Sequence, residues 1–294
     1  MMTSNATLLG VAAMVAATAL MPLSDALAKS LVAEYSAEQV SFVRNATHAA
    51  LLAPVVLITS GGRAVMAQLT WLQLLRALCF VLMTTCYVAG LRTTPLAEAM
   101  ATVFVFPCLV LAASALFLGE RVGPRRWGAA LAGFAGVAIV ANASFAEAGT
   151  GLLWVIAAAL FTAAYMVLTK AATSKGPILV MGLMPALIGS VLLLGPGLAA
   201  WTPPSLESAG LMVMVGCVAA SAHLLIVLAY AKAEASVIAP LAYLQIVSAT
   251  FLGFMLFGDL PALSAWVGIA IIIASGAFIA FRERRVPTGA AGRR

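Results

Sequence analysis

Long apolar runs alternate with short polar links along the whole chain. A bilayer core about 30 Å thick needs roughly 20 apolar residues per helix, so each run is long enough for one crossing. The predicted spans are 7–28, 37–59, 69–91, 95–118, 125–142, 150–171, 177–199, 206–229, 234–257 and 263–281. The links, such as "TSGGRA" and "TSKGP", hold most of the charges and turn residues. The pattern predicts an all-α integral membrane protein with ten transmembrane helices.

The composition agrees with this pattern. Of the 294 residues, 64% are hydrophobic and 9% are charged, whereas soluble proteins carry about 25% charged residues. The four cysteines lie inside apolar runs without CxxC spacing, which gives no indication of a metal site. The phosphate-binding motif GxxxxGK[ST] and the enzyme motifs HExxH and GxSxG do not occur in the sequence. We therefore predict no enzymatic activity, no metal or other cofactor, and no ATP hydrolysis.

Lysines and arginines are distributed unevenly between the two sides of the predicted bundle. Twelve of the 16 fall on the side of the N-terminus, and only Lys29 and Arg92 fall on the other. This bias predicts that both termini face the cytoplasm. The basic tail 282–294 then fits a cytoplasmic membrane face better than a nucleic-acid partner. Cleavage of the first span after "ALA" at 26–28 is the less favoured alternative, because its leader has no Lys or Arg.

The two halves of the chain resemble each other weakly. "LFLGERVGPRRWG" aligns with "MLFGDLPALSAWVG", which matches Trp127 to Trp266. "ALAKSL" and "VLTKAA" likewise match Lys29 to Lys170. Each half has five predicted helices, an odd number, so the second half must be inverted relative to the first. We predict two inverted five-helix repeats, 1–145 and 146–281, with a site at the membrane midplane and transport by alternating access.

Three runs carry a resemblance to a known family: "PLAEAMATVFVFPCLVLAASALFLGER", "AEASVIAPLAYLQIVSATFLGFMLFGDLP" and "DALAK…FVRN". They resemble the EamA-type drug/metabolite transporter superfamily, over nearly the whole chain. The resemblance implies ten helices in a bacterial inner membrane and the export or exchange of small metabolites. The chain is most similar to YddG-type amino-acid exporters, which implies export of neutral or aromatic amino acids. Import or exchange of a nucleoside-like or cofactor metabolite is the alternative, and a membrane scaffold without transport is the rival from another class.

Polar groups at membrane depth usually face a cavity or a partner. In the span 37–59, one helical face carries Ser41, Arg44, Asn45 and His48. Arg44 either attracts a substrate carboxylate or pairs with an acid on a neighbouring helix, and His48 is predicted to face the cavity. The other candidate substrate-binding residues are Tyr87, Tyr165, His223, Tyr243 and Gln245.

Candidates for coupling or gating lie in three spans. Asp25 and Lys29 are four residues apart and are predicted to pair with each other, although Asp25 is also a candidate for proton coupling. Pro107, near the middle of the span 95–118, removes a backbone donor and predicts a hinge or a fixed kink. The span 234–257 has its own proline, Pro240, near its cytoplasmic end.

The remaining predictions concern partners. Small residues at Gly128, Ala132 and Gly136 favour close helix packing and leave a homodimer open, although a monomer would suffice for transport. The lipid bilayer and a small-molecule substrate are the predicted partners. Proton coupling and the direction of transport stay open.

Overall fold

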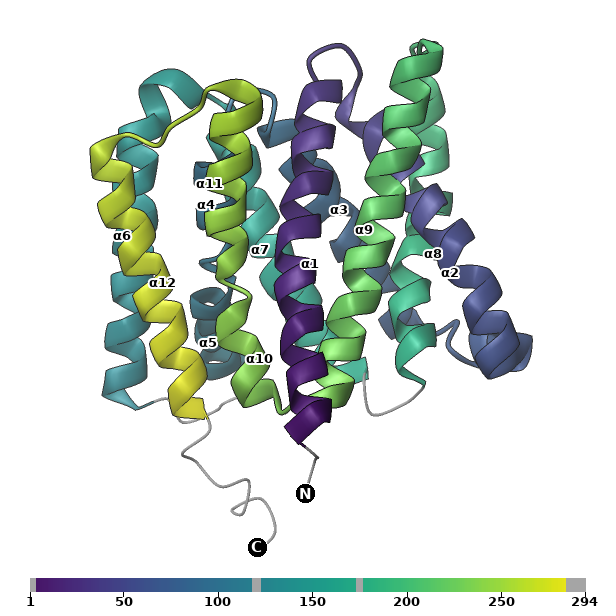
Figure 1. The fold of residues 1–294 in the computed structure, drawn as a ribbon, viewed down its shortest axis with the longest axis horizontal. Coiled ribbons are helices and arrows are strands. Elements are labelled where there is room, and N and C mark those ends of the chain that lie inside the picture. Colours follow the sequence, from purple (N-terminus) through teal and green to yellow (C-terminus); the bar gives the residue numbers. More distant parts are fainter. Residues whose placement is uncertain (1–3, 118–122, 173–176, 284–294) are drawn as a thin grey trace, which may run out of the picture.

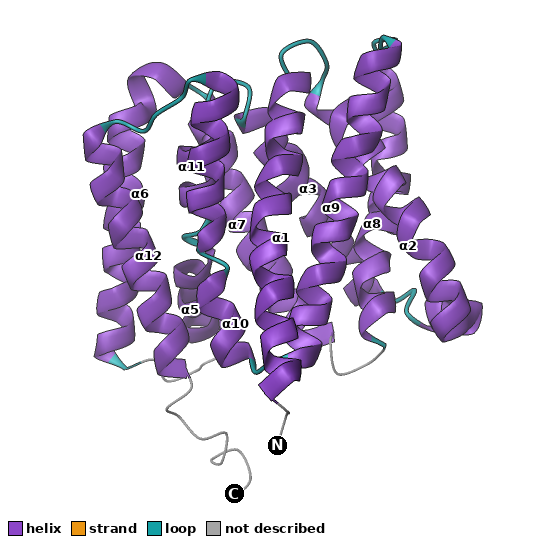
Figure 2. Cartoon of the chain, viewed as in Figure 1, coloured by secondary structure: helices purple, strands orange, loops and turns teal. Residues whose placement is uncertain are grey.

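The computed structural model describes residues 4–117, 123–172 and 177–283, and every regular element in these ranges is an α-helix (Figure 2). The helices are α1 (Ser4–Leu31), α2 (Ala37–Ala67), α3 (Trp71–Gly90), α4 (Leu96–Val103), α5 (Phe106–Phe117), α6 (Pro124–Ala148), α7 (Gly151–Ala172), α8 (Ile178–Ala199), α9 (Leu206–Lys232), α10 (Ala235–Leu241), α11 (Leu244–Phe257) and α12 (Leu263–Glu283). The predicted all-α class is confirmed.

The helices run side by side, and α1 begins at the same end of the bundle at which α12 ends (Figure 1). We call this end the terminal face and the other end the opposite face. Seven helical segments of the described part are long and apolar enough to cross a membrane. Two shorter apolar helices lie within α11 and α12. If α4 with α5, and α10 with α11, each count as one crossing, the arrangement is consistent with the ten predicted spans.

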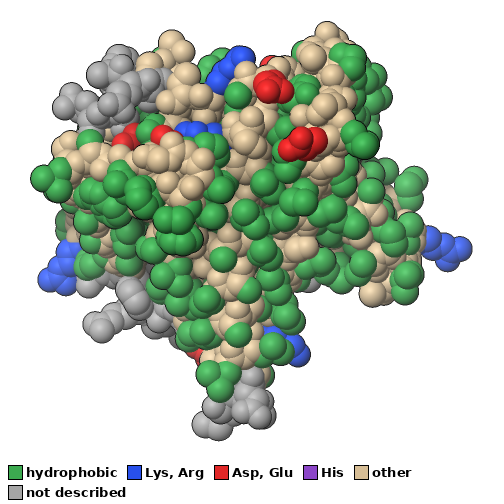
Figure 3. Space-filling view, turned by 45° about the horizontal axis from the view of Figure 1, so that its top comes forward, with side chains coloured by type: hydrophobic (Ala, Val, Ile, Leu, Met, Phe, Trp, Pro, Cys, Tyr) green, Lys and Arg blue, Asp and Glu red, His purple; other side chains and the backbone are tan. Residues whose placement is uncertain are grey.

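The flank of the bundle is apolar. In Figure 3, hydrophobic side chains cover much of the visible flank, and acidic side chains lie on the end that comes forward. Large side chains such as Ile58 (85% exposed), Val191 (69%) and Phe251 (61%) point outward. Soluble monomers rarely expose contiguous apolar surface of this kind. This apolar flank agrees with the multi-pass membrane protein predicted from the sequence, because lipid chains contact apolar side chains.

Two crossings are interrupted near mid-height. The first break separates α4 from α5 at Phe104 and Val105, and the second separates α10 from α11 at Ala242 and Tyr243. Figure 2 shows the second break as a loop within the bundle. Pro107 is the second residue of α5 and has no amide proton for the preceding turn. The proline therefore accompanies a break in the helix rather than a bend within one continuous helix.

Contacts between helices repeat across the two halves. α1 packs on α9 and α3 packs on α7, while α2 packs on α8 and α6 packs on α12. When α1, α2, α3 and α6 are matched in order with α7, α8, α9 and α12, these contacts map onto one another. The halves therefore face each other in a pseudo-twofold arrangement.

The small residues of α6 serve one of these contacts. A Cβ on Gly136 would lie 2.9 Å from the carbonyl oxygen of Gly268 in α12, so glycine is needed for this close approach. Gly128 has no neighbour within 4 Å of such a Cβ, and Ala132 is exposed. The predicted packing role therefore fits Gly136, within the chain, and not Gly128.

Candidate functional site

A cavity of about 940 Å³ lies between the two halves. Its walls come from both halves, including α1, α2, α3, α7, α9 and the interrupted helices α4–α5 and α10–α11. Toward the terminal face, its lining reaches Arg126, Tyr230 and Ile279, and toward the opposite face it ends at Asp25 and Tyr87. The cavity therefore extends from mid-bundle toward the terminal face.

All eight predicted substrate-binding residues line this cavity: Arg44, Asn45, His48, Tyr87, Tyr165, His223, Tyr243 and Gln245. Of the four coupling or gating candidates, Asp25 and Pro107 line it too. Lys29 and Pro240 are not among its described lining residues. The tertiary structure thus brings the polar positions of six separate predicted spans to one place.

Arg44 and Asp25 form an ion pair across α1 and α2. Arg44 Nη1 donates to Asp25 Oδ1 at 3.0 Å, and the Asp25 side chain is only 4% exposed. Of the two sequence interpretations of Arg44, the one in which an acid on a neighbouring helix holds it is therefore the one observed. Because each charge neutralises the other, neither is left as a bare ion beside the cavity.

Lys29 does not pair with Asp25, and that prediction is wrong. Its Nζ lies 2.8 Å from Asp259 Oδ2 and donates to the Thr94 carbonyl at 2.9 Å. The same ammonium lies 5.1 Å from the ring centroid of Phe257. The physical reason is depth: Asp25 lies one turn further inside, next to a guanidinium, whereas the flexible Lys29 side chain reaches the loops at the opposite face. Lys29 thereby joins α1 to the loops that follow α3 and α11.

Four rings from four helices form one aromatic wall. The His48 and His223 centroids are 5.1 Å apart, and His223 lies 6.5 Å from Phe80 in an edge-to-face arrangement. Phe80 in turn lies 5.5 Å from Tyr165. Offset and edge-to-face geometries are those that aromatic groups prefer, and a flat ligand can pack against such a wall. We call His48, Phe80, Tyr165 and His223 the aromatic wall.

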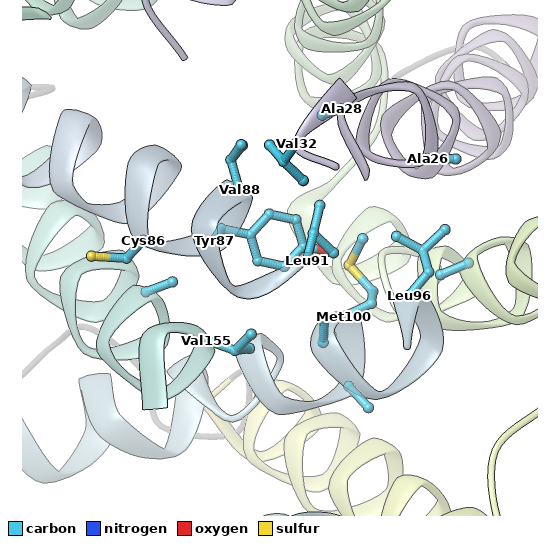
Figure 4. Packing of buried hydrophobic residues seen from close by; sticks show 14 of the residues in the cluster. Ala26, Ala28, Val32, Cys86, Tyr87, Val88, Leu91, Leu96, Met100 and Val155 are labelled. Carbon is cyan, nitrogen blue, oxygen red and sulfur yellow. The ribbon is translucent and has the colours of Figure 1, made fainter. Parts of the chain in front are cut away.

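A second group of rings lies at the helix breaks. The Phe104 ring lies 5.2 Å from Tyr243 and 6.0 Å from Phe106, measured between centroids. Toward the opposite face, Tyr87 closes the cavity from within a buried cluster, where its ring lies beside Leu91 with Met100 and Val155 nearby (Figure 4). That end of the cavity is thus lined by the Tyr87 ring together with the Asp25–Arg44 ion pair.

Several buried polar atoms of the lining have no hydrogen-bond partner among the described residues. They are His48 Nε2, His223 Nδ1 and the hydroxyl groups of Tyr87 and Tyr243. Buried polar groups are nearly always paired, so unpaired ones need an explanation. The four side chains that carry these atoms all line the cavity.

The apolar part of the site carries no distinguishing signal in the sequence. Phe80, Phe104, Phe106 and several methionines line the cavity, but in the sequence they cannot be distinguished from residues that face lipid. Arg76, which was not among the predicted site residues, contacts the site through Tyr165. In the described part of the chain, no group of three or more His, Cys, Asp or Glu residues is arranged to hold a metal ion.

Comparison with known proteins decides the family. The model of the EamA-like transporter family matches this chain twice, at residues 8–142 and 149–281. The chain belongs to the EamA-like transporter family. It is a transporter of small metabolites, and the predicted superfamily is confirmed.

Relatives of this EamA-like transporter carry two different names. A riboflavin transporter of Rhizobium johnstonii is 32% identical over 229 residues, which cover 76% of this chain and 75% of the relative. An S-adenosylmethionine uptake transporter of Rickettsia prowazekii is 23% identical over 263 residues, which cover 90% of this chain and 89% of the relative. One crystal structure is similar in fold, with a TM-score of 0.65 and 22% sequence identity. The match covers 96% of this chain and 99% of the other chain, and it supports the fold alone.

Proposed function

We propose that this chain is a secondary transporter that takes up an uncharged, planar heteroaromatic metabolite of the cofactor type. The observation that carries the proposal is the group of polar side chains His48, His223, Tyr87 and Tyr243, which line one cavity among aromatic rings and each keep a buried polar atom without a hydrogen-bond partner in the described part of the chain. Flat ring faces suit the aromatic wall, and ring nitrogens or carbonyls suit the unpaired donors and acceptors. At about 940 Å³ the cavity is at the upper end of the range for small-molecule sites.

The charges of the lining favour an uncharged ligand over a cation. In the described part of the chain, the charged lining residues are Asp25, Arg44 and Arg126, which is one acid against two bases. Asp25 is already paired with Arg44. S-adenosylmethionine carries a sulfonium cation, for which the described lining residues leave no unpaired carboxylate. Riboflavin, named for the Rhizobium johnstonii relative, is uncharged and has a planar ring system.

Amino-acid export, implied by the sequence resemblance, has less support than this alternative. A zwitterionic amino acid needs one group for its carboxylate and another for its ammonium. Arg44 and Asp25 are the matching groups of the lining, yet they bond to each other. For direction, the name of the Rickettsia prowazekii relative, an uptake transporter, favours uptake over export.

The fold supports alternating access as the mechanism. The cavity extends toward the terminal face, and the Lys29–Asp259 ion pair lies at the opposite face. With ten spans and cytoplasmic termini, this form of the protein would be open to the cytoplasm. Tilting one half against the other would then expose the site to the opposite face. The flux experiment below, with and without a pH gradient, tests whether transport is coupled to protons.

Flux measurements in proteoliposomes test the proposal. We expect saturable counterflow of riboflavin, with little flux of S-adenosylmethionine or tryptophan, and none in liposomes without the protein. An imposed pH gradient would change the rate only if protons are coupled. Tryptophan flux without riboflavin flux would restore the exporter prediction. Absence of flux for the whole panel, with binding also absent, would contradict the proposed substrate class.

A further inference from the structure

Arg76 is a buried charge that the transport site, as described so far, does not use. It lies on α3, is 2% exposed, and is not itself among the described residues that line the cavity. No carboxylate of residues 4–117, 123–172 and 177–283 forms an ion pair with it. A guanidinium at membrane depth without a counter-ion is costly, so its presence here requires a reason.

Neutral acceptors hold the guanidinium in one orientation. Nε donates to Thr169 Oγ1 at 2.9 Å, and Nη1 donates to Gln73 Oε1 at 2.7 Å. Nη2 donates to the carbonyl oxygen of Met181 at 2.6 Å. Because the group is planar and its donors are fixed in a fork, these three bonds determine where the second N–H of Nη2 points.

That remaining contact is to the aromatic wall. Arg76 Nη2 donates to the Tyr165 hydroxyl oxygen at 3.2 Å, and the guanidinium carbon lies 5.2 Å from the centroid of the tyrosine ring. Arginine has donors and no acceptor, so the tyrosine oxygen must accept this bond. The hydroxyl proton of Tyr165 cannot point to Arg76, and no described residue accepts it.

We propose that Arg76 is a positioning residue that fixes Tyr165 as a hydrogen-bond donor to the transported molecule. The molecule must then present an acceptor, such as a ring carbonyl or an imine nitrogen, where it meets α7. Phe80, 5.5 Å from Tyr165, supplies an adjacent ring face, so the acceptor belongs to the edge of the same planar ring. This inference rests on the proposed function and specifies one point of recognition within it.

A double-mutant cycle in detergent tests the inference, with riboflavin as the fluorescent probe and its quenching on binding as the signal. We expect Tyr165→Phe to raise the Kd about tenfold, as loss of one buried hydrogen bond would. Arg76→Met should raise it about fivefold in the native background and not at all in the Tyr165→Phe background. Arg76→Lys keeps the charge without the fork, and should show the same dependence on Tyr165.

The control is Arg63→Gln, which removes an exposed charge of α2 and should leave the Kd unchanged. Melting temperatures show whether each variant is folded, and Arg76→Lys replaces Arg76→Met in the cycle if the latter is not. Equal effects of the Arg76 variants with and without the Tyr165 hydroxyl would overturn the inference, as would an unchanged Kd. Failure of the native protein to bind the probe would instead overturn the proposed function, and this inference with it.

Discussion

The rings of Phe104 and Tyr243 pack against each other with centroids 5.2 Å apart, although the two residues belong to different halves of the chain. Each lies at the break of an interrupted crossing, and Tyr243 follows Phe104 by the same number of residues as Trp266 follows Trp127. Both also line the cavity. The equivalent breaks of the two repeats therefore meet beside the proposed substrate. Relative motion of the halves would change the contacts of both rings with that substrate.

The glycine behind Tyr243 gives the first prediction. A Cβ at Gly276 in α12 would collide with the Tyr243 hydroxyl. Gly276→Ala should therefore displace the tyrosine, destabilise the protein by about 1–3 kcal/mol and weaken probe binding. Gly128→Ala is the matched control, because a Cβ there has no neighbour within 4 Å. Equal melting temperatures and Kd values for both variants would show that the Tyr243 position is not constrained by this contact.

Replacing one partner of the Arg44–Asp25 ion pair should lower stability more, per residue replaced, than replacing both partners. Asp25→Asn leaves the Arg44 charge without its partner, and Arg44→Gln leaves the Asp25 charge alone in a site where it is 4% exposed. We expect each single variant to lose about 3 kcal/mol of stability, and the double variant to lose less than the sum. Thermal unfolding of all three in one detergent measures this. Additive losses would mean that the two charges are stabilised independently.

The Lys29–Asp259 pair should stabilise closure of the opposite face. Its side chains are 13% and 30% exposed, so we expect a contribution of about 1 kcal/mol, or about a fivefold shift in the equilibrium between conformations. Lys29→Asp should change the counterflow rate of the transported probe, and the charge-swapped double variant with Asp259→Lys should restore it. Arg92→Gln, an exposed change in the α3–α4 link, is the control. No rescue by the swap would argue against the closure role.

The histidine pair discriminates a transporter from a scaffold. Each imidazole has an unpaired buried nitrogen on the cavity. His48→Leu or His223→Leu should lower flux about tenfold with folding intact, because the hydrogen bond to the transported molecule is lost. Ile58→Leu, at a position that is 85% exposed on the flank, should have no effect. Full flux in both histidine variants would remove these residues from the site.

Much of the fold was readable from the sequence for a simple reason. In a bilayer every backbone polar group must be satisfied within its own segment, so long apolar runs must be helices. Polar residues inside such runs are costly, which is why Arg44, His48, Tyr165 and His223 could be singled out. The same reasoning does not reach Phe80 or Phe104, because lipid and a cavity wall both accept a phenylalanine.

Partner choice among the charges was decided by the tertiary structure. Spacing along one helix favoured Asp25 with Lys29, yet each found its partner on another segment, Arg44 and Asp259 respectively. A local i, i+4 pair contributes only about 0.2–0.5 kcal/mol, and a better placed charge on a neighbouring segment outweighs it.

The sequence by itself determined the class, the apolar helices and the family resemblance, because the bilayer constrains helix length and penalises polar side chains wherever they occur. It placed residues 59–64 in a link, whereas they lie within α2, where only Gly61 has non-helical backbone angles. It did not determine that both interrupted helices break at equivalent places. Nor did it determine that Arg76 donates to the Tyr165 hydroxyl oxygen, so that the hydroxyl proton points elsewhere. Those features depend on contacts between residues far apart in the chain. Only the packing of one half against the other brings such residues within reach of each other.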